Sequence, residues 1–178
     1  GKGPAIGQPT KYFDSDVFSV WNYTRLFGSW NHGLFQTPSA WTDAAHRNGT
    51  DMYSGIKFFD TTGNPGGVSS AEWRALIATK NSDGTYKYVD PIINCLMYFG
   101  VDGINFNWED AGYANKEVIE FHQALNKKAA ENGFNNFHMG IYTAVQGLTT
   151  ANVSALYGDS KGRTCDFFAN YSAGDFAW

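Results

Sequence analysis

Residues 101–109, with the sequence VDGINFNWE, decide the fold that we expect for this chain. Side chains alternate between the two faces of a strand, so a strand here has two different faces. One face is polar and ends in a carboxyl group: Asn105, Asn107 and Glu109. The other face is apolar and suited to packing under helices: Ile104, Phe106 and Trp108. Buried polar groups are costly unless they are hydrogen-bonded or used, so the polar face is a candidate functional surface.

The sequence on both sides of this stretch alternates between β-type and helical segments. Five segments rich in β-branched and aromatic residues are expected strands: 17–23, 51–59, 101–108, 137–142 and 165–171. Helices are expected to begin near Ser39, at Ser69 or Ser70, at Asp90-Pro91 and at Lys116, with a short helix over 151–156. The alternation predicts a parallel sheet within one domain over residues 1–178.

The number of strands leaves two architectures open. A (β/α)8 TIM barrel needs eight strands and typically about 250 residues, whereas this chain has 178 residues. The chain is therefore either an open doubly wound sheet or an incomplete barrel of five strand–helix units. In a barrel, active sites lie at the carboxyl ends of the strands, which is where Glu109 is placed.

The composition excludes several classes of protein. The chain has 13 basic and 17 acidic residues and a net charge of −4, which argues against a nucleic-acid partner. Its apolar runs are shorter than the roughly 18 residues of a membrane span. The four histidines lack metal-ligand spacing, so we expect no metal and no other cofactor. We expect Cys95 and Cys165 to be buried free thiols, although a single disulfide stays open.

One carboxyl group with an amide two residues before it suits a particular kind of glycoside hydrolysis. Most glycosidases need two carboxyl groups. In substrate-assisted hydrolysis the 2-acetamido oxygen of the sugar is the nucleophile, and the protein supplies one acid and one group that orients the acetamide. Glu109 and Asn107 fit these two roles. The alternative is that Glu109 caps the next helix or pairs with a surface cation.

The stretch DGINFNWE resembles the catalytic strand of glycoside hydrolase family 85, the endo-β-N-acetylglucosaminidases, whose pattern is D-G-x-x-x-N-x-E. It also resembles the family 18 chitinase-like pattern D-G-x-D-x-D-x-E, with Asn at both inner Asp positions. Three further segments are similar to family 85 motifs: WTDAAHRNG at 41–49, GIY at 140–142 and FANY at 168–171. The motifs occur in the family's order, and the similarity covers about residues 17–172. The resemblance implies a TIM barrel, of which this chain holds about strands two to six.

The resemblance implies an activity and roles for individual residues. The expected reaction cleaves the β-1,4 bond between the two core N-acetylglucosamines of an N-glycan with retention, and an oxazoline intermediate allows transglycosylation. The implied catalytic residues are Glu109, Asn107 and Tyr142. Candidate substrate-binding residues are Asn105, Asn170, Tyr171, Trp21, Trp30, His32 and Trp178. Only one of Asn170 and Tyr171 can face inward, and we expect Asn170 to do so.

Some expectations concern structure, partners and place. Asp102 faces away from Glu109 and is expected to be structural, while His46 and Arg47 are expected to fix a helix to the sheet. Family members often have Glu where this chain has Phe59-Asp60, so that substrate contact is in doubt. The partner that the resemblance implies is an N-linked glycan or glycoprotein. Bacterial members of the family are secreted or surface-bound, whereas eukaryotic members are largely cytosolic. For this protein we favour a secreted or cell-surface location over the cytoplasm. A family 18 hydrolase and an inactive carbohydrate-binding barrel stay open as alternatives.

Overall fold

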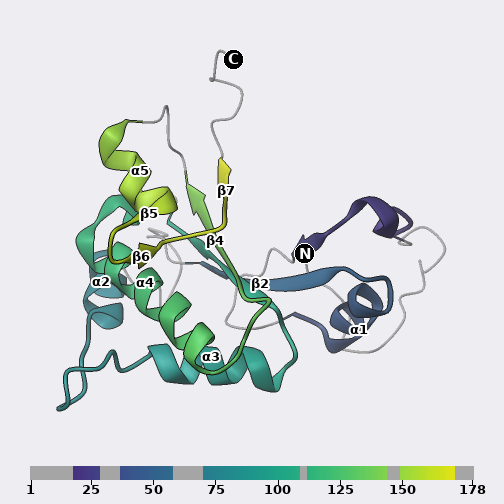
Figure 1. The fold of residues 1–178 in the computed structure, drawn as a ribbon, viewed down its shortest axis with the longest axis horizontal. Helices are drawn as coiled ribbons and strands as arrows, with labels where there is room; N and C mark the ends of the chain where they lie inside the picture. Colours follow the sequence, from purple (N-terminus) through teal and green to yellow (C-terminus); the bar gives the residue numbers. More distant parts are fainter. Residues whose placement is uncertain (1–17, 29–36, 58–69, 109–111, 144–148, 171–178) are drawn as a thin grey trace, which may run out of the picture.

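A computed structural model describes residues 18–28, 37–57, 70–108, 112–143 and 149–170. Its main sheet has five parallel strands in the order β1-β2-β3-β4-β7, and the sheet curls into a half-barrel (Figure 1). The strands are β1 (Leu26–Gly28), β2 (Asp51–Lys57), β3 (Gly103–Asn107), β4 (His138–Thr143) and β7 (Phe167–Asn170). Strand order follows chain order, so the partial TIM barrel is confirmed and the doubly wound sheet is wrong.

Helices connect successive strands, as the parallel pairing requires. They are α1 (Ser39–Arg47), α2 (Ser70–Ile77), α3 (Val89–Tyr98), α4 (Lys116–Glu131) and α5 (Thr150–Tyr157), with short turns η1 (Trp21–Tyr23) and η2 (Gly112–Ala114). Figure 1 shows α2 to α5 gathered on one side of the strands. No helix among the described residues is long and apolar enough to cross a bilayer.

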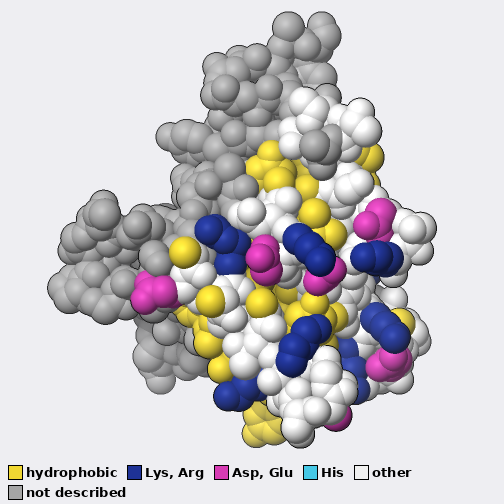
Figure 2. Space-filling model, turned by 90° about the vertical axis from the view of Figure 1, so that its left-hand side faces the viewer, with side chains coloured by type: hydrophobic (Ala, Val, Ile, Leu, Met, Phe, Trp, Pro, Cys, Tyr) yellow, Lys and Arg dark blue, Asp and Glu magenta, His cyan; other side chains and the backbone are white. Residues whose placement is uncertain are grey.

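The apolar face of β3 forms the centre of the core, as its alternating pattern predicted. Ile104, Phe106 and Trp108 are fully buried. Phe106 meets Phe121 of α4 edge-on, with ring centroids 6.1 Å apart. Burial of one such large side chain contributes roughly 1.5–3 kcal/mol, so this face holds the helices onto the sheet. On the solvent side, Figure 2 shows cationic and anionic side chains interspersed. One exposed ion pair of α4 joins Lys127 to Glu131.

Two predictions of secondary structure are wrong. The strand expected over 17–23 is not formed: residues 21–23 make η1, and the strand begins at Leu26. The aromatic residues that suggested a strand pack together instead, since Trp21 lies 4.5 Å from Phe18 and 5.6 Å from Phe27, centroid to centroid. Between the short helix expected over 151–156 and the last strand, where no strand is expected, the chain forms a small hairpin, β5 (Gly158–Asp159) with β6 (Gly162–Arg163). Such two-residue strands have no periodic pattern to detect.

Asp102 joins β3 to its surroundings, and its predicted structural role is confirmed. Its Oδ2 accepts hydrogen bonds from Nε2 of His46 (2.6 Å) and the backbone N–H of Met52 (2.8 Å). Its Oδ1 accepts one from Nδ2 of Asn136 (2.8 Å). His46 therefore ties α1 to the sheet, as predicted. Arg47 does not: its guanidinium is largely exposed and pairs with Asp43 within α1.

Gly103, the next residue, leaves room on the inner face of the sheet. A Cβ here would lie 2.4 Å from the carbonyl oxygen of His138, so any larger residue collides with backbone. His138 pairs with Asp51, 2.7 Å away at the start of β2. The pair joins the second and fourth strands of the sheet across β3, which lies between them.

Candidate active site

Two predicted catalytic residues lie side by side at the carboxyl ends of adjacent strands. Asn107 is the last residue of β3, and the strand register places it opposite Tyr142 of β4. Residues opposite each other in a parallel pair point to the same face, which here is the inner face of the half-barrel. Asn107 is 3% exposed and Tyr142 is half-buried. Glu109, two residues after Asn107 in the sequence, lies outside the described residues.

Asn105 lies one step deeper on the same inner face. It is 5% exposed, and its strand neighbours are Gly55 on β2 and Gly140 on β4. Among the described residues, its Oδ1 has no hydrogen-bond partner. A methyl group on residue 140 would lie 2.8 Å from this oxygen, so the glycine leaves the space that the amide occupies. A buried acceptor without a donor is rare in folded proteins, which marks Asn105 as a position for a polar contact.

Aromatic rings form the floor beneath these amides. The rings of Tyr53 and Phe167 have centroids 5.3 Å apart. Tyr53 lies over Gly28, and Phe167 lies over Gly140, at distances where a Cβ on either glycine would overlap the ring. Burial raises the pKa of the Tyr53 hydroxyl above its ordinary value of 10.0, so this group stays protonated. The site therefore has half-buried aromatic rings below its polar amides.

The other predicted binding residues are placed only in part. Trp21 packs against Phe18 and Phe27, and its stacking on a sugar stays a prediction. Asn170 ends β7, with its backbone opposite Thr143 of β4, while its side chain is outside the described part. Five further candidates also lie outside the described residues: Glu109, Trp30, His32, Tyr171 and Trp178.

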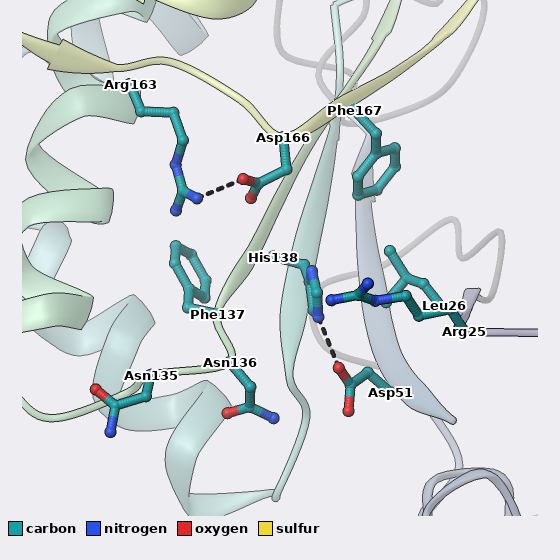
Figure 3. A pocket seen from close by; sticks show the side chains of 10 residues that line it. All are labelled: Arg25, Leu26, Asp51, Asn135, Asn136, Phe137, His138, Arg163, Asp166 and Phe167. Carbon is teal, nitrogen blue, oxygen red and sulfur yellow. Dashed lines mark hydrogen bonds and ion pairs between the residues drawn. The ribbon is translucent and has the colours of Figure 1, made fainter. Parts of the chain in front are cut away.

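A pocket of about 530 Å³ lies at the opposite end of the sheet, where the strands begin (Figure 3). Its wall includes the His138–Asp51 pair and a second ion pair between Arg163 and Asp166. The amino-terminal end of a β/α barrel normally serves stability. The His138–Asp51 pair links β4 to β2 across β3 there, and the Arg163–Asp166 pair is local to the segment that leads from β6 to β7. The sequence did not predict the His138–Asp51 pair, because nothing in the pattern joins residues 87 positions apart. It did not predict the Arg163–Asp166 pair either, although these residues are only three positions apart.

The cysteines and the candidate metal ligands add little to the site. Cys95 and Cys165 are free thiols, so the disulfide alternative is wrong. Cys165 is buried, as predicted, whereas Cys95 is half-buried. Burial raises the pKa of the Cys165 thiol to about 12, and the thiol donates to the carbonyl oxygen of Leu156. Within the described ranges, no group of three or more acidic, histidine or cysteine side chains is arranged to hold a metal ion.

The curled parallel sheet and the polar groups at its carboxyl end define part of a (β/α)-barrel hydrolase. The sequence pattern of Glycosyl hydrolase family 85 matches residues 4–171, and the chain belongs to this family. The fold resembles the glycoside hydrolase domain of Endo-D from Streptococcus pneumoniae R6, with 22% identity and a TM-score of 0.68. That match covers 86% of this chain and 25% of the Endo-D chain, so this chain spans a quarter of its length. A comparison with curated proteins gave no match.

Proposed function

We propose that this chain supplies the catalytic strands of an endo-β-N-acetylglucosaminidase that cleaves the β-1,4 bond of the N-glycan chitobiose core. One observation carries the proposal: Asn107 lies opposite Tyr142 at the carboxyl ends of adjacent inner strands, two residues before Glu109. Membership of Glycosyl hydrolase family 85 and the fold shared with Endo-D support it.

The proposed reaction has two displacements at the anomeric carbon. In the first, the acetamide oxygen of the sugar attacks this carbon, and Glu109 donates a proton to the departing glycosidic oxygen. The side-chain oxygen of Asn107 accepts the acetamide N–H, which directs the acetamide oxygen to the carbon and stabilises the charge that develops on nitrogen. In the second, Glu109 takes a proton from water as it opens the oxazoline. Two inversions give net retention.

Burial of Asn107 strengthens this role. Its side chain is nearly excluded from water, so a hydrogen bond from the acetamide meets little competition from solvent. We propose that the Tyr142 hydroxyl, on the neighbouring strand, reaches the acetamide or the leaving oxygen. An acceptor sugar that replaces water in the second step would give transglycosylation. The proposed partner is an N-linked glycan or glycoprotein, met in a secreted or cell-surface setting.

The test is glycan release from a high-mannose glycoprotein, followed by intact mass. The full-length protein should leave a single N-acetylglucosamine on the substrate. Glu109→Gln should abolish release, and Asn107→Ala should slow it about 100-fold, as for loss of one charge-stabilising contact. Glu117→Gln and Asn94→Ala change exposed residues of α4 and α3 and should leave the rate unchanged. Wild-type-like release by Glu109→Gln would refute the proposal, and binding without release would favour an inactive carbohydrate-binding barrel.

A further inference from the structure

Trp108, between Asn107 and Glu109, is held at two points. It is fully buried, and its backbone N–H donates to the carbonyl oxygen of Tyr142 at 2.9 Å. Its indole Nε1–H donates to Nε2 of His122 on α4, with 3.3 Å between the nitrogens. The first bond continues the β3–β4 pairing by one residue, and the second fixes the side chain to the helix layer.

His122 is an unusual residue for its place. It is fully buried in the apolar layer between β3 and α4, and its ring lies 4.8 Å from that of Phe106. Because Nε2 accepts the indole hydrogen, the proton of the neutral ring is on Nδ1. The ring also hydrogen-bonds with the backbone of Thr164, which by itself would raise the pKa of His122, but burial has the larger effect. Burial lowers the pKa of His122 to about 3, so the ring stays neutral and Nε2 stays an acceptor at ordinary pH.

The two hydrogen bonds of His122, to Trp108 and to the backbone of Thr164, account for a polar ring in an apolar layer. Phenylalanine would fill a similar space, as Phe121 does one position earlier on α4, but it could make neither bond. What imidazole provides and phenyl cannot is an acceptor for the indole of Trp108. Trp108 stands between Asn107 and Glu109 in the sequence, so this acceptor holds the residue that joins the two.

We infer that His122 is a positioning residue, which holds the indole of Trp108 and thereby sets the position of the Glu109 carboxyl group for proton transfer. The inference rests on the proposed function, in which Glu109 is the acid. General acid catalysis needs a hydrogen-bond distance between the carboxyl group and the leaving oxygen. A displacement of about 1 Å at a reacting group can cost about 100-fold in rate, so a small change at Trp108 is enough to be measured.

The test compares three variants in the full-length protein. His122→Phe keeps the volume and removes the acceptor, so kcat for glycan release should fall at least tenfold with KM changed less than twofold. His122→Gln restores an acceptor oxygen near the position of Nε2, so kcat should return to within threefold of wild type. Leu125→Val shortens another buried side chain of α4 and keeps the imidazole acceptor, so it should lower Tm and leave kcat unchanged.

A space-filling role for His122 would give the opposite order, because Phe fits an apolar layer better than Gln. Two further readouts separate positioning from structure. The alkaline limb of the kcat–pH profile, which reports the acid, should move in His122→Phe and not in Leu125→Val. The indole N–H resonance of Trp108, assigned with Trp108→Phe, should shift upfield in His122→Phe and stay near its wild-type position in His122→Gln.

The outcomes distinguish this inference from the function on which it rests. If the wild type releases no glycan, the proposed function fails and the inference fails with it. If the wild type releases glycan and His122→Phe keeps its kcat and pH profile, only the inference fails. A loss in His122→Gln as large as that in His122→Phe would also overturn it.

Discussion

Removal of the Asp102 carboxylate tests how far one side chain holds the half-barrel together. Asp102 is 7% exposed and accepts three hydrogen bonds, from α1, from β2 and from the turn before β4. Asp102→Ala leaves the buried N–H of Met52 without an acceptor, at a cost of about 1–3 kcal/mol. The bond to Asn136 adds about 1 kcal/mol. The His46 side chain is 41% exposed, so its ion pair adds less than about 1 kcal/mol.

The expected loss is therefore about 4 kcal/mol, which corresponds to a drop in Tm of roughly 8–16 °C for a domain of this size. Asp102→Asn keeps one acceptor oxygen and should lose less than half as much. Thermal unfolding followed by circular dichroism, with urea unfolding at fixed temperature, measures both. Asp43→Ala breaks an exposed ion pair on the same helix as His46 and should cost less than about 1 kcal/mol. If Asp102→Ala lowers Tm and the free energy of unfolding no more than Asp43→Ala does, the reasoning is refuted.

Three further predictions concern backbone space, pH and thiol reactivity. Gly103→Ala should destabilise the protein by about 3 kcal/mol in urea unfolding, since the new methyl group meets the His138 carbonyl oxygen at 2.4 Å. The pKa of His122 is lowered to about 3, below the value of 6.5 expected when unfolded, so the unfolded state binds the extra proton. Stability should therefore fall as pH drops from 6.5 towards 3, by up to about 1.4 kcal/mol per pH unit from this group. Because burial raises the pKa of Cys165 to about 12, iodoacetamide at pH 8 should label this thiol only after unfolding, as mass spectrometry can show.

Each of these has its own control. Gly133 has a φ of +72° and open space around a Cβ, so Gly133→Ala should cost only about 1 kcal/mol; an equal effect at Gly103 would contradict the steric argument. His122→Phe should remove the pH-dependent difference, and a wild-type curve parallel to that of the variant would show that His122 does not titrate as described. Cys95, half-buried, serves as the internal reference for labelling; rapid native labelling of Cys165 would contradict its burial.

The alternation of residues 103–108 was enough to predict the central strand and both of its faces. Period-2 patterning determines which side chains share a face, so the buried Phe106 and the inner Asn107 followed directly. The adjacency of Asn107 and Tyr142 needed only a parallel sheet and the resemblance to the family. Residue alternation is a local property and strand adjacency a topological one, and both can be predicted from the sequence pattern.

The contacts that hold the site in place could not be predicted in the same way. The bond from Trp108 to His122 depends on which side of α4 meets β3, and the His138–Asp51 pair depends on the register of three strands. The aromatic stretch before Leu26 was misleading because aromatic residues favour strands and also cluster with one another. Tertiary packing decided between these two outcomes.

The strand order has a consequence for how the chain folds during synthesis. Each strand of the main sheet pairs with the strand made before it, so the sheet can grow one strand–helix unit at a time as the chain emerges. Loop closure is then limited to one crossover at each step, which keeps contact order low for a parallel sheet. The His138–Asp51 pair is an exception, because His138 is synthesised 87 residues after Asp51 and the pair can form only then. Its formation would report that the three consecutive strands β2, β3 and β4 have docked in register.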